Sequence, residues 1–156
     1  MTLEEKLKRL KQIEQENTEP DWAKYKEDWV KAVKELQDTI MYKWFHNYDK
    51  NKLMEFAVIP VKRIEPHIGE YMTTSLEITL ANNKTLLLEP IAGITTEYSG
   101  KLEFSMLGNA YKNVSILRHL LDNNQHEWIL ATSYDSKDHR ILTKAELEKF
   151  IDTWLF

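Results

Sequence analysis

The chain has 156 residues, no cysteine, and 21 basic against 25 acidic side chains, for a formal net charge of -4. A chain of this length is typical of one domain with a core of its own. The lack of cysteine excludes disulfide scaffolds, thiolate nucleophiles and zinc sites built on sulfur, and it is typical of a reducing compartment. The acidic balance argues against sequence-independent binding of nucleic acid.

No segment of the sequence is typical of a membrane span or of a secretory signal. The longest stretch without a charged side chain covers residues 104–111, whereas a membrane-spanning helix needs about 20 apolar residues. The first residues carry charges in place of an apolar segment. We therefore expect a cytoplasmic protein with no membrane partner.

The N-terminal residues predict a short amphipathic helix. Thr2 and Glu5 have the spacing of a capping box. Apolar residues then follow at three- and four-residue intervals on one face, namely Leu3, Leu7, Leu10 and Ile13. The polar residues before Pro20 end this helix, because proline disfavours helical backbone at the residue before it.

A second helix is predicted from Trp22 to about Phe45, with Asp21 as its cap. Its apolar residues recur at spacings of three and four, which keeps them on one narrow stripe. They are Trp22, Tyr25, Trp29, Val33, Leu36, Ile40 and Trp44. At 1.5 Å per residue this helix is about 36 Å long, so we expect one end of its stripe to extend past a small sheet.

From residue 54 the apolar pattern becomes that of strands. Pro60 lies in an apolar run and places the first strand at a sheet edge or a bulge, since proline cannot donate to the ladder. The alternation over 76–80 and 85–88, with Asn82-Asn83 between them, predicts a β-hairpin. A second hairpin is predicted from 94–98 and 102–106 around Ser99-Gly100.

In the last third of the chain the pattern predicts one strand and a terminal helix, and it leaves the type of a third element undecided. Residues 114–121 fit either a strand or a short helix. Residues 128–134 are uncharged with a β-branched centre, which is typical of a buried strand. Thr143 and Glu146 form another capping box, and the apolar stripe that follows predicts a terminal helix.

Helices at both ends of a run of strands predict an α+β domain. In this fold N-terminal helices, one of them long and amphipathic, pack on a curved antiparallel sheet together with a C-terminal helix. We expect a single domain over 1–156, helical over 1–46, mainly β over 54–134 and helical again over 143–155. No linker and no internal repeat divides it.

One polar cluster has the residue types of acid-base chemistry. His67 lies between Glu65 and Glu70 on a segment that Pro66 and Gly69 make loop-like, and a carboxylate raises the basicity of a neighbouring imidazole. The alternative is a solvated turn with no specific role, which is the commoner fate of charged loop residues. No nucleophile, phosphate-binding or metalloprotease motif is present.

The sequence predicts no metal site and no cofactor. Asp135, Asp138 and His139 could collect a divalent ion, but Lys137 and Arg140 in the same turn oppose a cation. A turn that begins at Asp135 is the better interpretation. The remaining histidines lack the spacing of zinc ligands.

The aromatic residues at the end of the long helix are the candidate binding site. Trp44, Phe45 and Tyr48 lie where the stripe would extend beyond the sheet, and aromatic side chains are favoured at interaction surfaces. The alternative is that they are ordinary core. A partner there would be another protein or a second copy of the chain.

The resulting prediction is a small cytoplasmic module that binds a protein or itself and carries out no catalysis. An immunity-type or antitoxin-like inhibitor and an adaptor in a bacterial system are roles of this class. The alternative is a hydrolase-type enzyme whose scattered site surrounds His67. Nucleic acid is not an expected partner, because the cations alternate with acids along the chain.

Overall fold

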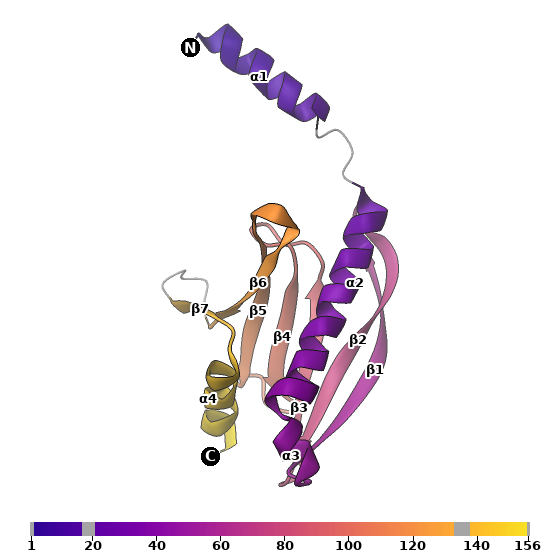
Figure 1. The fold of residues 1–156 in the computed structure, drawn as a ribbon, viewed down its shortest axis with the longest axis vertical. Coiled ribbons are helices and arrows are strands. Elements are labelled where there is room, and N and C mark those ends of the chain that lie inside the picture. Colours follow the sequence, from indigo (N-terminus) through magenta and orange to yellow (C-terminus); the bar gives the residue numbers. More distant parts are fainter. Residues whose placement is uncertain (1, 17–20, 133–137, 156) are drawn as a thin grey trace.

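The computed structural model describes residues 2–16, 21–132 and 138–155, which form helices at both ends and a sheet between them (Figure 1). The elements are α1 (Leu3–Glu16), α2 (Trp22–Asp38), the π-helical turn η1 (Thr39–Trp44), α3 (His46–Lys50), β1 (Met54–Glu65), β2 (Gly69–Leu80), β3 (Thr85–Ala92), β4 (Lys101–Met106), β5 (Asn113–Leu120), the 3-10 turn η2 (Asp122–Asn124), β6 (His126–Ala131), β7 (His139–Ile141) and α4 (Lys144–Leu155).

Within the described residues the sheet has seven strands, and each strand pairs antiparallel with the next one along the chain. It is open, with β1 and β7 at its two edges. Short turns join most neighbours, so the strands need no crossover helices. This confirms the predicted α+β fold with an antiparallel sheet.

Pro60 lies in β1 opposite Thr74 of β2. Since β1 is an edge strand, the missing N–H of the proline costs no ladder bond on the open side. The edge position predicted from Pro60 is therefore confirmed.

One buried cluster unites α2, α4 and the sheet. Trp29 of α2 is fully buried, as are Leu88 and Phe104 on the sheet, and Trp154 of α4 stacks on Phe104 with ring centroids 5.4 Å apart. Apolar side chains alternate with more exposed ones along β4, so a single face of the strand enters the core. The two helices thus cover the apolar face of the sheet, as the sequence predicted.

The predicted helix caps form. The Thr2 hydroxyl accepts from the Glu5 N–H at 3.2 Å, and the Glu5 carboxylate accepts from the Thr2 N–H at 3.0 Å. Asp21 accepts from the N–H of Lys24 at the start of α2. Thr143 accepts from the N–H of Glu146 at the start of α4. These bonds satisfy N–H groups that a helix start leaves without an intrahelical partner.

The long helix changes its winding at its end. Its last turn is π-helical, and the Phe45 N–H donates to the Ile40 carbonyl at 2.9 Å, five residues back. A π turn carries one more residue than an α turn. As a result Phe45 occupies the buried position in which the regular stripe places Trp44, and Trp44 is only half-buried.

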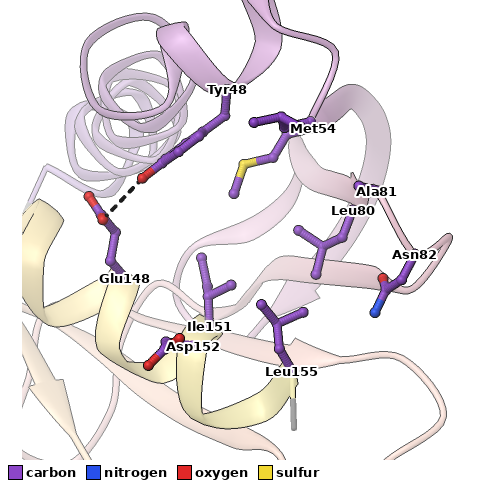
Figure 2. A pocket seen from close by; sticks show the side chains of 10 residues that line it. Tyr48, Met54, Leu80, Ala81, Asn82, Glu148, Ile151, Asp152 and Leu155 are labelled. Carbon is purple, nitrogen blue, oxygen red and sulfur yellow. Dashed lines mark hydrogen bonds between the residues drawn. The ribbon is translucent and has the colours of Figure 1, made fainter.

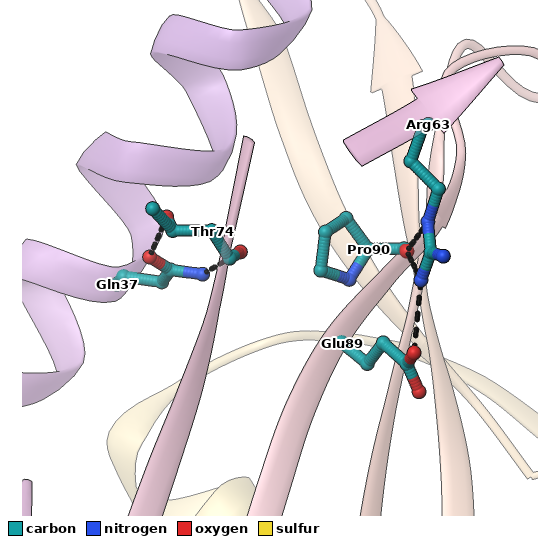
Figure 3. Close-up of polar contacts among 5 residues, drawn as sticks. All are labelled: Gln37, Arg63, Thr74, Glu89 and Pro90. Carbon is teal, nitrogen blue, oxygen red and sulfur yellow. Dashed lines mark hydrogen bonds and ion pairs between the residues drawn. The ribbon is translucent and has the colours of Figure 1, made fainter. Parts of the chain in front are cut away.

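The β1–β2 ribbon separates from the rest of the sheet over its distal half. β1 and β2 pair along their whole length, but β2 pairs with β3 only over 76–79. Side chains tie the separated ribbon to α2 and to β3 (Figure 3). Gln37 donates to the Thr74 carbonyl at 2.7 Å, and Arg63 donates to the Pro90 carbonyl at 3.0 and 2.9 Å and to the Glu89 carboxylate at 2.8 Å. Backbone acceptors that lack a strand partner here are thereby satisfied.

The second predicted hairpin is wrong in its first strand. β3 runs to Ala92 and pairs directly with β4, and residues 93–100 form a loop. Within this loop the Thr95 hydroxyl accepts from the Tyr98 N–H at 3.0 Å, which closes a tight turn. A local side-chain bond of this kind competes with strand formation.

Other boundaries differ from the sequence prediction in smaller ways. The segment left open over 114–121 is a strand, β5, which ends at Leu120. β6 covers only the first part of the strand predicted over 128–134, and residues 133 and 134 lie outside the described residues. The short elements α3 and β7 and the long extensions of β1 and β2 were not predicted, because they lack a sustained apolar period.

Helix α1 stands apart from the sheet in Figure 1. Leu3, Leu7 and Leu10 expose 73, 55 and 61% of their surface. From the sequence, the end of the long stripe that extends past the sheet would be covered either by this first helix folding back through its leucines or by a second copy of the chain. The described residues do not show the fold-back.

Candidate functional site

A cavity of about 500 Å³ lies between α3, the turn after β2 and α4 (Figure 2). Its volume is within the range of small-ligand and side-chain pockets. The lining residues are Tyr48, Leu53, Met54, Leu80, Ala81, Asn82, Glu148, Ile151, Asp152 and Leu155.

The apolar wall of the cavity follows from strand register and helix period. Met54 and Leu80 are directly opposite each other in the β1–β2 ladder, so their side chains lie on the same face. Ile151 and Leu155 are four residues apart on α4 and form one stripe. All four residues belong to or pack against the core cluster, so the wall is held rigidly from behind.

The polar edge of the cavity comes from α3 and α4. Glu148 and Asp152 are four residues apart on α4, one step around the helix from the apolar stripe. The Tyr48 hydroxyl donates to the Glu148 carboxylate at 3.2 Å and ties α3 to α4 (Figure 2). The Lys144 ammonium lies 3.7 Å from Glu148.

The electrostatics of the lining favour a cation. Among the described residues, the lining includes the carboxylates of Glu148 and Asp152 and no lysine, arginine or histidine, and Glu148 is paired with Lys144 from outside the lining. Burial and the neighbouring Glu148 carboxylate raise the pKa of Tyr48 above its ordinary value, so the phenol stays protonated and acts as a hydrogen-bond donor. An apolar group next to a positive charge would therefore find matching surroundings here.

The three predicted binding residues lie in different parts of the structure. Tyr48 lies at the edge of the cavity. Phe45 is fully buried, and its ring packs 5.7 Å from that of Tyr48. Trp44 lines a separate hollow of about 340 Å³ with His126 and Trp128.

The predicted acid-base residues do not form a cluster. The exposed His67 stacks on Trp22 with ring centroids 5.3 Å apart. Glu70 pairs with Lys62 at 3.1 Å on the ribbon. Glu65 accepts from the Gly93 N–H at 2.9 Å and from the Tyr71 hydroxyl. Each side chain thus has its own partner, and the loop-like segment around Pro66 is a tight turn between β1 and β2.

The Glu65 carboxylate belongs instead to a buried network that sequence reasoning missed. The Trp29 indole donates to the Tyr71 hydroxyl at 3.2 Å, and Tyr71 in turn donates to Glu65. The Arg118 side chain is 2% exposed, with its guanidinium 5.1 Å from the Trp29 ring centre. The bonds through Tyr71 hold the end of the β1–β2 ribbon against α2, and the Arg118 contact holds β5 against the same helix. They join residues up to 89 positions apart, so no local pattern could reveal them.

A second, more polar hollow of about 680 Å³ lies near Tyr98 and His139. The Tyr98 hydroxyl and the His139 Nδ1 are 3.1 Å apart. Its lining includes Thr132, the last described residue before the gap, and Asp135, Ser136 and Lys137 of the predicted turn lie outside the described residues.

Within the part of the chain that the structure describes, no three acidic or histidine side chains gather into a possible metal site. Among the same residues, no helix combines the length and the apolar character that a membrane crossing requires. Comparison with protein-family models, with curated proteins and with solved structures finds no match to this chain, so its own site is the basis for a functional proposal.

Proposed function

We propose that this chain is a protein-binding module whose cavity between α3, β2 and α4 receives an apolar side chain flanked by a positive charge. The observation that carries the proposal is the two-sided lining, with apolar side chains from the core on one side and Glu148 and Asp152 on the other. Binding sites of this kind use apolar contact for affinity and a few polar groups for orientation.

Binding is the function that the described geometry supports better than catalysis. Tyr48 is a hydrogen-bond donor whose pKa is raised, which makes it a poor base at neutral pH. His67, the histidine that the sequence analysis named as a candidate for acid-base chemistry, stacks on Trp22 and does not line this cavity. An immunity-type inhibitor or an adaptor would use the cavity in the same way, as the anchor for one projecting segment of its partner.

The proposed compartment is the cytoplasm. A chain of 156 residues without a single cysteine is suited to a reducing environment. This part of the proposal is checked by locating the tagged chain in fractions of its native cells.

The binding proposal is tested with small probes of one shape and different charge. Hexylammonium, hexanol and hexanoate share an apolar tail, and their binding is followed by NMR shifts of the amides of α4. We expect the ammonium to bind most tightly, the alcohol less tightly and the carboxylate least, because the cavity edge is anionic.

Two substitutions assign the effect to the cavity. Ile151→Trp fills the apolar side and should abolish the shifts for every probe, whereas Glu148→Gln should remove most of the preference for the ammonium. Glu146→Gln is the matched control, since Glu146 lies on the same helix but faces Lys149 and Arg140 and does not line the cavity. Equal binding of the three probes, or shifts confined to another face, would contradict the proposal.

A further inference from the structure

The chain carries a segment with the chemistry that the cavity requires. On α1, Leu3, Leu7 and Leu10 form an exposed stripe with the i, i+4, i+7 spacing by which a helix anchors in a groove. Lys6 and Lys11 flank this stripe at 100° per residue. Residues 3–11 contain four cations and two carboxylates.

Helix α1 requires a surface to pack on. Isolated helices shorter than about 12 to 15 residues are marginal in water, and α1 has 14 residues. In the described structure its leucines are more than half exposed, so packing on the sheet does not supply the missing stability. Exposed apolar stripes of this kind mark interaction sites.

The cavity of the same chain lies too far away for this stripe. Counting 1.5 Å for each helical residue and about 3.5 Å for each of the others, Leu10 lies at most about 26 Å from Asp21, Leu7 about 31 Å and Leu3 about 37 Å. The cavity lies beyond Trp44, at the other end of a helix that runs roughly 33 Å from Trp22. Leu10 therefore falls short of the cavity of its own chain, so the complete stripe cannot lie there.

We infer that α1 of a second copy of this chain occupies the cavity, with its leucines against Ile151 and Leu155 and its lysines near Glu148 and Asp152. This inference rests on the proposed function, because it names the partner of the same cavity. If each copy supplies α1 to the other, the two contacts are equivalent and close a symmetric dimer. The exchange doubles the apolar area that one short helix could bury alone.

The test measures the molar mass of the full chain by sedimentation equilibrium from micromolar to millimolar concentration. We expect a reversible dimer. Leu7→Glu should leave a folded monomer, because α1 adds little to the core of the described structure. Lys6→Glu with Lys11→Glu should raise the dimer dissociation constant by about fivefold or more, as expected for two partly exposed charge pairs that become repulsive.

A charge exchange identifies the two surfaces that meet. Glu148→Lys with Asp152→Lys should weaken the dimer as much as the α1 reversal does, and combining both reversals should restore it. Lys8→Glu with Arg9→Glu is the matched control: it changes the net charge of α1 by the same amount on the side away from the leucines, and should leave the dissociation constant within about twofold.

Two results would overturn the inference. One is a wild-type chain that remains monomeric at millimolar concentration. The other is a dimer that Leu7→Glu disrupts but that the cavity reversals do not affect, which would mean that α1 pairs with another α1. In either case the binding of hexylammonium in the cavity decides separately whether the proposed function stands.

Discussion

Single side chains decide how the split in the sheet is closed. Tyr71 is 5% exposed, accepts from the Trp29 indole and donates to Glu65. Glu65 in turn holds the backbone N–H of Gly93, whose carbonyl accepts from the Tyr25 hydroxyl at 2.6 Å. A residue at the centre of such a chain of bonds affects both strands and the helix above them.

Tyr71 also makes stability depend on alkaline pH. Burial and the bond to Glu65 raise the pKa of Tyr71 well above its ordinary value of 10.0. The unfolded chain therefore loses this proton from about pH 10 upward while the folded chain keeps it, so the free energy of unfolding falls as the pH rises above 10. Tyr71→Phe should cost about 1 to 2 kcal/mol at pH 7 and make the loss of stability between pH 9 and 11 shallower.

Urea unfolding midpoints at pH 8, 9, 10 and 11 measure this effect. Tyr111→Phe is the control, since Tyr111 is 97% exposed and should leave both the midpoint and its pH dependence unchanged. If Tyr71→Phe shows the same slope against pH as the wild type, Tyr71 titrates normally and its network is not rigid.

Gly100 is another single residue on which the packing of the core depends, because the Trp29 side chain lies close to its backbone. Gly100 has a φ of +147°, and a Cβ there would lie 2.2 Å from the Trp29 ring. The large ring of Trp29 is therefore accommodated by a residue without a side chain. This requirement is invisible in the sequence, where Ser99-Gly100 is typical of an ordinary turn.

At the scale of elements, α4 illustrates how far periodicity can be trusted. Its apolar stripe and its Thr143 cap predict a helix, and Leu147, Ile151 and Trp154 are buried in the structure. The π turn at the end of α2 illustrates the limit. The stripe from Trp22 to Trp44 assumes a constant winding, and one additional residue in a single turn exchanges the environments of Trp44 and Phe45.

The contribution of α4 is measured through Trp154. Its ring stacks on Phe104 and packs 5.8 Å from Phe150. Trp154→Ala should lower the free energy of unfolding by about 3 to 5 kcal/mol, from lost burial and the cavity that remains. Chemical denaturation gives the value, with Thr153→Ala, an exposed neighbour on the same helix, as the control. An unchanged midpoint would show that α4 is peripheral to the fold.

At the scale of the molecule, both helices and the sheet share one buried cluster. A single core predicts a single cooperative transition for residues 21–155. Far-UV circular dichroism and tryptophan fluorescence should give the same unfolding midpoint in urea. Two separated transitions would mean that α4 with β7, or the β1–β2 ribbon, unfolds independently.

The fold class followed from the sequence because apolar periodicity and caps are local properties. The capping box at Thr2, the Thr143 cap, the long stripe as far as Ile40 and the edge position of Pro60 each depend on a few neighbouring residues, and the structure confirms them. Part of the candidate site was also within reach, since Tyr48 was predicted at the end of the long helix and lines the cavity.

Only the tertiary structure decided which distant residues meet. The cavity combines Tyr48 with Leu80 and with Glu148, which are 32 and 100 positions away along the chain. The scatter of Glu65, His67 and Glu70 is likewise set by partners elsewhere, namely Gly93, Trp22 and Lys62. Period and capping report the environment of one element, whereas the composition of a site depends on how separate elements pack, and that packing is fixed by the shared core rather than by any local pattern.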